Sequence, residues 1–230
     1  MKQFFKEYSL FLSLFVALFT SLGIALLLTD KAELHLWLNG CHTQFGDVFL
    51  RYYTHIAEYG IYAIAFIMLF WKAGASIFLL IGELAGAIVV QTVKHILRAP
   101  RPKVFFDLEN NPDALPIVEG VHLHSSNSFP SGHTCTFFIL FFVLAIVIAF
   151  YNSDIKNSSR KLCQSVCFLL AALGAYSRIY LSQHFALDIF AGGIIGTLVV
   201  TMLYPAFLWL NNRFPKVCAW HIALPKRRRE

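Results

Sequence analysis

The stretch PSGHTCTFFILFFVLAIVIAF, residues 130–150, passes from a polar tetrapeptide into an uncharged apolar run. About 20 apolar residues are enough to cross a lipid bilayer as a helix. His133 stands where the chain would enter lipid, and an ionisable side chain at such a position is a functional hypothesis by default. The stretch therefore predicts a membrane-spanning helix that carries a candidate functional group at its start.

The composition of the whole chain indicates an integral membrane protein. Hydrophobic residues make up 57% of the 230 residues, and the mean hydropathy is +0.62. Charged residues make up 14%, against about 25% in ordinary soluble domains. The basic tail PKRRRE, residues 225–230, follows an apolar helix, where a topology signal explains it more simply than a nucleic-acid surface. We expect no nucleic-acid partner.

The five cysteines show no disulfide or metal pattern. Their number is odd, and Cys163 and Cys167 are one helical turn apart rather than in a CxxC motif. They are interpreted as small hydrophobic side chains in helices. The sequence therefore predicts no metal and no cofactor.

Apolar segments along the chain predict an all-α, polytopic fold in one integral-membrane domain, residues 1–230. No polar segment is long enough to form a second domain. The spacings Gly82-x3-Gly86 and Gly192-x3-Gly196 would let helix backbones approach closely in lipid. Six membrane spans are expected, at roughly 8–28, 55–71, 74–97, 133–151, 162–181 and 186–210.

Two connecting segments are long enough to have a structure of their own. Residues 30–53 mix apolar and polar residues at helical spacing, which predicts an interfacial helix after the first span, anchored by Trp37, Tyr52 and Tyr53. Residues 103–130 form the longest polar segment, which is interpreted either as a lid over a site or as a solvated loop.

The distribution of basic residues predicts the orientation. If both termini are cytoplasmic, twelve of the 19 lysines and arginines lie on the cytoplasmic side and seven on the other, as the positive-inside rule requires. We expect a multi-pass protein of a bacterial cytoplasmic (inner) membrane. The segments 94–102, 130–133 and 177–188 would then meet at the periplasmic face.

These three segments supply a predicted phosphate site. Lys94, Arg101 and Arg178 are three cations at one face, and because like charges repel, their convergence implies an anion between them. The planar fork of arginine fits phosphate oxygens. Ser131 and Gly132 add the unpaired N–H groups of a helix start, where glycine lets an anion approach the backbone.

Two histidines and an aspartate add candidate catalytic groups. His184 precedes Asp188 by four residues, so on a helix the two side chains would share a face. The carboxylate can fix the tautomer of the imidazole and leave its other nitrogen free for nucleophilic attack. His133, at the phosphate site, is placed to protonate a leaving oxygen.

The motifs K-x6-RP (94–102), PSGH (130–133) and SR-x5-H-x3-D (177–188), in this order, resemble the type 2 phosphatidic acid phosphatase (PAP2) superfamily. That superfamily includes membrane lipid phosphatases, soluble acid phosphatases and haloperoxidases. No motif position departs from the pattern. Three ordered motifs with fixed internal spacing are a specific signal, and the six-helix frame extends the resemblance over nearly the whole chain.

The resemblance implies a metal-independent phosphatase that acts on a lipid phosphate in the membrane. The residue matching His184 would attack phosphorus and form a phosphohistidine. The residue matching His133 would protonate the leaving group, and water would then hydrolyse the intermediate. The phosphate would be held by the positions matching Lys94, Arg101, Ser131, Gly132 and Arg178.

Several alternatives stay open at this point. The substrate could be undecaprenyl diphosphate, phosphatidylglycerol phosphate, phosphatidic acid or lipid A, and a lipid phosphotransferase on the same scaffold would use the same residues. A transporter is disfavoured because few polar residues lie at mid-membrane depth. The sequence contains no signal for an oligomeric state.

Three polar residues outside the motifs have weaker signals. Glu83 precedes Lys94 by eleven residues, which is about 16 Å along a helix. It is interpreted as a structural hydrogen bond to a neighbouring helix rather than a proton carrier. His122 and His124 lack the further cysteine or histidine pair of a zinc site and are expected at the substrate entrance.

Overall fold

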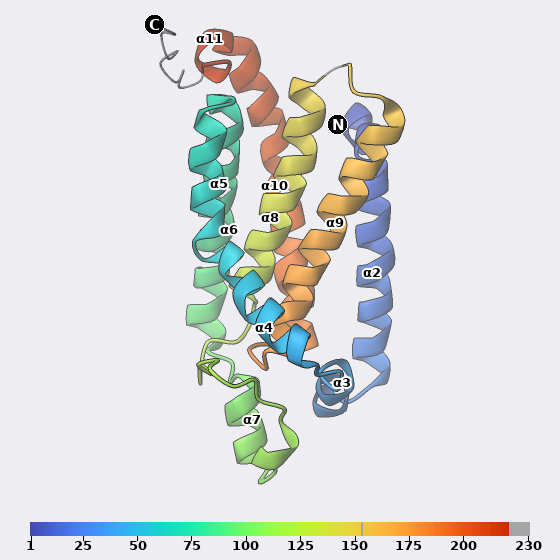
Figure 1. Cartoon of the computed structure of the whole chain (residues 1–230), viewed down its shortest axis with the longest axis vertical. Helices are drawn as coiled ribbons and strands as arrows, with labels where there is room; N and C mark the ends of the chain where they lie inside the picture. Colours follow the sequence, from blue (N-terminus) through green and yellow to red (C-terminus); the bar gives the residue numbers. More distant parts are fainter. Residues whose placement is uncertain (153, 221–230) are drawn as a thin grey trace, which may run out of the picture.

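The computed structural model describes residues 1–152 and 154–220, and every regular element in these two ranges is a helix. The basic tail, residues 225–230, lies outside the described residues. The expected all-α fold is confirmed. Five helices of the described ranges are long and apolar enough to cross a membrane. These are α2 (Ser9–Leu28), α6 (Ala73–Leu97), α8 (Gly132–Tyr151), α9 (Asn157–Tyr180) and α10 (Ala186–Arg213), which run side by side in Figure 1.

The predicted span 55–71 contains a much shorter helix. Its helix α5 (Gly60–Leu69) has ten residues and follows the 3-10 turn η1 (Thr54–Ala57). A ten-residue helix is about 15 Å long, roughly half the thickness of the hydrocarbon core. The expected count of six spans is therefore not confirmed by helix length, although α5 packs against α6 in the bundle.

The segment after the first span forms two short helices instead of one. These are α3 (Lys31–Leu38) and α4 (Gln44–Tyr53), and α7 (Pro102–Leu108) lies at the same end of the bundle (Figure 1). Trp37 and Tyr52 are exposed, as expected of interfacial anchors. Tyr53 is not an anchor, because its ring stacks on Phe137 and its hydroxyl donates to the carbonyl of Leu170.

The two ends of the described chain lie at the opposite end of the bundle. The short helices α1 (Lys2–Glu7) and α11 (Pro215–Cys218) are far from α3, α4 and α7 in Figure 1. An even number of passes along the bundle is required for this arrangement. The 3-10 turn η2 (Pro112–Ala114) belongs to the same long connection as α7.

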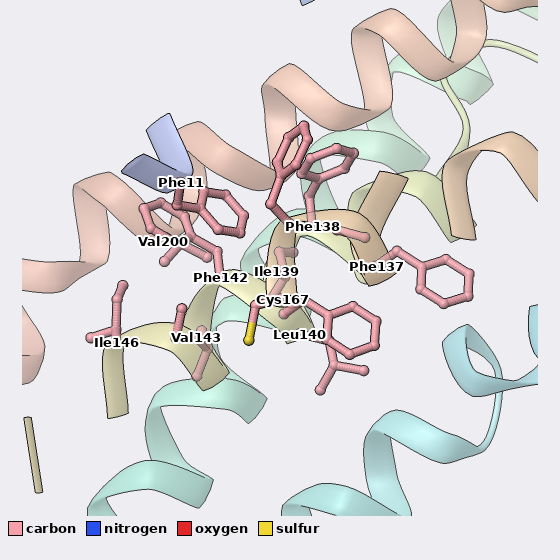
Figure 2. Close-up of a cluster of buried hydrophobic side chains, with 14 of the residues drawn as sticks. Phe11, Phe137, Phe138, Ile139, Leu140, Phe142, Val143, Ile146, Cys167 and Val200 are labelled. Carbon is pink, nitrogen blue, oxygen red and sulfur yellow. The ribbon is translucent and has the colours of Figure 1, made fainter. Parts of the chain in front are cut away.

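Helix α8 is the centre of the bundle. It is apolar around its whole circumference, and a helix of that kind is buried. It packs against α6, α9 and α10, and most of its side chains are buried. Figure 2 shows Phe137, Phe138 and Phe142 in this core, where Phe142 stacks on Phe11 of α2 with ring centroids 4.3 Å apart.

Glycines let α10 and α6 approach the backbone of α8. A Cβ atom added at Gly196 would lie 2.5 Å from the carbonyl oxygen of Cys135, and one at Gly192 would collide with the carbonyl oxygen of Ser131. On α6, a Cβ at Gly86 would lie 2.5 Å from Cδ1 of Ile139. The predicted close-approach spacings are confirmed, and the contact at Gly192 fixes the start of α8 against α10.

We expect Gly192→Ala to destabilise the protein because the new methyl group meets a backbone atom that has no rotamer to change. Overpacking of this kind costs about 1–3 kcal/mol. The melting temperature in detergent should fall by several degrees. Gly23→Ala is the matched control, since a Cβ there would make only an ordinary 3.4 Å contact with Phe190. Equal melting temperatures for the two variants would contradict the close approach.

Candidate active site

The predicted site residues lie where helices begin and end, at the end of the bundle that carries α3, α4 and α7. Lys94 and Arg178 are in the last turns of α6 and α9, and Arg101 directly precedes α7. Gly132 begins α8, and Asp188 is in the first turn of α10. Helix ends that are far apart in the sequence therefore gather these polar side chains in one place.

His184 lies in the connection between α9 and α10, not on a helix as the sequence analysis expected. The connection turns back because the N–H groups of Gln183 and His184 both donate to the carbonyl of Arg178. The expected contact with Asp188 is still made, with 3.3 Å between Nδ1 of His184 and Oδ2 of Asp188. Both side chains are buried.

The Asp188 carboxylate is held by two further donors. The Ser128 hydroxyl donates to Oδ2 over 2.5 Å, and the backbone N–H of Phe185 donates to the same oxygen over 2.9 Å. A carboxylate facing Nδ1 favours the tautomer with the proton on that nitrogen. Nε2 of His184 then carries the free lone pair, and it faces Nη1 of Arg101 at 3.4 Å.

The His184 ring is held in its neutral form by its surroundings. Burial, followed by the charges of Arg101 and Arg178, lowers the pKa of the imidazole well below its ordinary value. Burial and neighbouring cations both disfavour a charged ring. The free nitrogen therefore keeps its lone pair at neutral pH.

The two arginines are fixed by groups outside the motifs. Arg101 donates through Nε to the carbonyl of Ser126, and through Nη1 to the carbonyl and the side-chain oxygen of Gln183, each over 3.0 Å. Arg178 donates to the hydroxyl of Thr54, while its buried Nε has no hydrogen-bond partner among the described residues. Both guanidinium groups are thus positioned, and that of Arg178 retains an unused donor.

A cavity of about 250 Å³ lies in front of these groups. Five of the eight predicted site residues line it: Lys94, Arg101, Gly132, His133 and His184. Arg178 lines a second cavity of about 250 Å³, together with Glu58, His122 and His124. His122 and His124 therefore lie near Arg178, and their place at a substrate entrance stays a prediction.

Ser131 lies at the start of α8, as expected, but its polar groups already have partners there. Its side chain does not face the cavity: its Oγ caps α8 by accepting from the N–H of Thr134 over 3.3 Å. Its own N–H donates to the carbonyl of Asp188 over 2.9 Å. The structure therefore presents Ser131 as a link between the starts of α8 and α10, and Asp188 stands behind His184 rather than at the cavity surface.

His133 has a partner that the sequence analysis did not find. Its Nε2 lies 2.9 Å from Oε1 of Glu58, and the other oxygen of Glu58 lies 2.8 Å from Nδ1 of His55. Glu58 follows η1 and precedes α5. Each of the two histidines that line the cavity thus contacts a carboxylate: His184 contacts Asp188, and His133 contacts Glu58.

Glu83 makes the structural hydrogen bond that was expected, because the hydroxyl of Thr136 on α8 donates to its Oε1 over 2.9 Å. The 103–130 segment is more than a solvated loop, since its residue Ser128 is buried against Asp188. Among the described residues, no group of three or more histidine, cysteine or acidic side chains has the arrangement of a metal site.

Fold and site together define a helical membrane protein with a cationic cavity next to a buried, neutral histidine. The chain belongs to the PAP2 superfamily, whose family model matches residues 74–213. This confirms the resemblance seen in the three motifs. The match runs from α6 to α10 and includes every predicted site residue.

Relatives of known name extend the match beyond that core. Lipid A 4'-phosphatase of Porphyromonas gingivalis is 28% identical over 195 residues, which cover 82% of this chain and 77% of that protein. Lipid phosphate phosphatase 1 of Arabidopsis thaliana is 30% identical over 56% of this chain, but the match covers only 43% of the plant protein. A PA-phosphatase related-family protein of Dictyostelium discoideum is matched over 40% of its length. The chain thus spans less than half the length of these two eukaryotic relatives.

Two solved structures share the fold. Aquifex aeolicus LpxE superimposes with a TM-score of 0.59 at 23% identity, covering 76% of this chain and 94% of LpxE. The first transmembrane PAP2-type phosphatidylglycerolphosphate phosphatase from Bacillus subtilis gives a TM-score of 0.62 at 21% identity. That match covers 90% of this chain and 98% of the Bacillus protein. At these identities the likeness establishes the shared helical architecture.

The lowered pKa of His184 can be measured directly by nuclear magnetic resonance of ¹⁵N-histidine-labelled protein in detergent. We expect the His184 signal, identified by its loss in His184→Asn, to stay that of a neutral ring down to a pH well below the ordinary value of about 6.5. The sign follows from the lowered pKa, because the ring then gains its proton only at more acidic pH. A midpoint at or above the ordinary value would contradict the electrostatic description of the site.

Proposed function

We propose that the protein is a lipid phosphate phosphatase of an inner membrane. The observation that carries this proposal is the surroundings of His184. Its Nδ1 faces the Asp188 carboxylate, and its Nε2 faces Arg101 and the cationic cavity. A neutral, oriented imidazole that opens onto a cationic cavity is suited to attack an anionic phosphoryl group.

In the proposed first step, Nε2 of His184 attacks phosphorus and the bond from phosphorus to the lipid oxygen breaks. The new P–N bond leaves a positive charge on the ring, and Asp188 stabilises that charge through Nδ1–H. Ser128 and the N–H of Phe185 keep the carboxylate in place. The product of this step is a phosphohistidine.

The lipid oxygen that leaves requires a proton. Protonated His133 supplies it across the cavity and becomes neutral. Glu58 stabilises the protonated ring beforehand through its contact with Nε2. In the second step a water molecule gives its proton to His133 and attacks phosphorus, which releases inorganic phosphate and restores His184.

The phosphate oxygens are held by charge and by backbone donors. Lys94 and Arg101 line the cavity, and the free N–H groups at the start of α8 begin at Gly132. Arg178 offers its unpaired Nε from the neighbouring side. We assign Ser131 a positioning role, because its hydroxyl is engaged in the cap of α8.

The substrate is proposed to be a lipid whose phosphate reaches this end of the bundle from the periplasmic leaflet. The excess of basic residues near the opposite end supports cytoplasmic termini. Two relatives are named for lipid A and for phosphatidylglycerolphosphate. Substrates of that class present a charged phosphate at the interface while their acyl chains stay in lipid.

The proposal predicts release of inorganic phosphate from lipid phosphates by the purified protein in the presence of EDTA. His184→Asn should lower kcat by about three orders of magnitude or more, because the nucleophile is lost. Release can be followed in H₂¹⁸O, where phosphate that carries ¹⁸O shows that water is the acceptor. The matched control is His95→Asn, an exposed histidine of α6 that should retain activity. Near-normal turnover by His184→Asn would exclude the phosphohistidine route.

Glu58→Gln tests the contact with His133. The amide keeps the shape of the side chain but not its charge, so it can no longer stabilise a positive charge on the His133 ring. We expect kcat to fall by about 10-fold, which is less than the loss of about 100-fold or more expected when a general acid is removed, because His133 itself is retained. Glu109→Gln, at an exposed position, is the control. An unchanged kcat would show that Glu58 does not act on the proton donor.

A further inference from the structure

The catalytic cavity extends beyond the groups that the reaction uses. Besides the histidines and cations, its lining includes Gly86 and Glu83 of α6 and Thr136 of α8. These residues lie about one to three helical turns from Lys94 and Gly132 along α6 and α8, toward the middle of the two helices. The cavity therefore continues from the phosphate position into the layer where the lipid part of a substrate would lie.

Glu83 is much closer to the reaction than its distance from Lys94 along α6 suggests. Helices α6 and α8 run in opposite directions, so Glu83 meets α8 at Thr136. Thr136 is three residues from His133 on the same helix, which corresponds to a rise of about 4.5 Å. Glu83 is thus about one helical turn from the side chain proposed to protonate the leaving oxygen.

One oxygen of Glu83 lacks a partner. Thr136 donates to Oε1, whereas Oε2 is buried and has no hydrogen-bond partner among the described residues. A buried carboxyl oxygen without a partner is costly, and a carboxyl group at membrane depth is a functional hypothesis by default. The hydrogen bond from Thr136 explains the burial of Oε1 but not that of Oε2.

The helix face around Glu83 leaves space for a ligand. Gly86 and Ala87, on the next turn of α6, have little or no side chain and line the same cavity. Leu84 and Ile88, on the outer face of α6, are exposed, as expected of lipid-facing residues. Glu83 therefore lies on the side of α6 that lines the cavity rather than on the lipid-facing side.

We propose that Glu83 is a specificity-determining residue that accepts, through Oε2, a hydrogen bond from an O–H or N–H group on the leaving part of the substrate. This inference rests on the proposed phosphatase function. It adds that the protein prefers lipid phosphates whose leaving group carries a hydrogen-bond donor. Glycerol and glycosyl leaving groups carry such donors next to the reacting oxygen. The glycerol of phosphatidic acid, with both remaining oxygens acylated, and a polyprenyl phosphate leaving group have none on their carbon skeletons.

The sharpest test compares two substrates that differ in one hydroxyl group. These are phosphatidylglycerol phosphate and its analogue with a propanediol linker, which lacks the hydroxyl beside the phosphate-bearing carbon. We expect the protein to prefer the hydroxylated lipid by about 10-fold or more in kcat/KM, since a site built around a hydroxyl group discriminates against the analogue that lacks it. A lipid A phosphate and phosphatidic acid complete the panel, so that glycerol and glycosyl donors can be told apart.

Glu83→Gln replaces one carboxyl oxygen by an N–H donor and keeps the shape of the side chain. We expect it to reduce the preference for the hydroxylated lipid to about 1, with little change in the rate on phosphatidic acid. The control is Thr136→Val, which removes the bond between the helices but leaves the carboxyl group, and which should retain the preference. A merely structural role for Glu83 would instead lower the rates on all lipids together in both variants.

The inference is overturned if the unmodified protein hydrolyses both matched lipids equally, or if Glu83→Gln leaves their ratio unchanged. A ratio that survives in Glu83→Gln would mean that this side chain does not act as the acceptor. Failure to hydrolyse any lipid of the panel would be a different result. It would refute the proposed function itself, and the inference with it.

Discussion

The close approach of the starts of α8 and α10 is the constraint on which the rest of the site depends. The N–H of Ser131 donates to the carbonyl of Asp188, and Gly192 leaves room for the carbonyl oxygen of Ser131. This contact fixes the N–H groups and His133 at the start of α8 relative to the His184–Asp188 pair. A shift of about 1 Å between attacking group and phosphate is enough to reduce a reaction rate about 100-fold, so the absence of a side chain at Gly192 has a catalytic consequence.

The sequence predicted the motif residues because each motif combines a chemical group with a helix end. The sequence predicted the span that starts at Gly132 from its apolar run and from the polar tetrapeptide before it. It also predicted the pairing of His184 with Asp188 from their spacing, and the cations near helix ends. The sequence did not predict hydrogen-bond partners that lie far apart along the chain. Ser128 and Glu58 are single polar residues in irregular segments, and only the packing of those segments shows which histidine or carboxylate each one meets.

Distances across the bundle were the least predictable quantity. The spacing of eleven residues from Glu83 to Lys94 measures a distance along one helix. It contains no information about which residue of α8 lies opposite, because that depends on the register between two antiparallel helices. The same limit applies to the 55–71 segment, where hydropathy predicted a span but the chain forms a 3-10 turn at residues 54–57 and a short helix. The turn is what places Thr54 and Glu58 beside Arg178 and His133.

The carboxyl groups of Asp188, Glu58 and Glu83 lie near a site that would bind an anionic phosphate, and each has a different partner. Asp188 is buried, and its Oδ2 accepts from Ser128 and Phe185 and faces His184, so in the proposed reaction it can stabilise a charge that forms on that ring. Glu58 is partly exposed beside His133, where its charge can retain a proton until the leaving oxygen takes it. Glu83 accepts from Thr136 through one oxygen, and its other oxygen has no hydrogen-bond partner among the described residues. A negative group close to the phosphate would repel the substrate, and each carboxyl group avoids this by facing a histidine or the lipid part of the cavity.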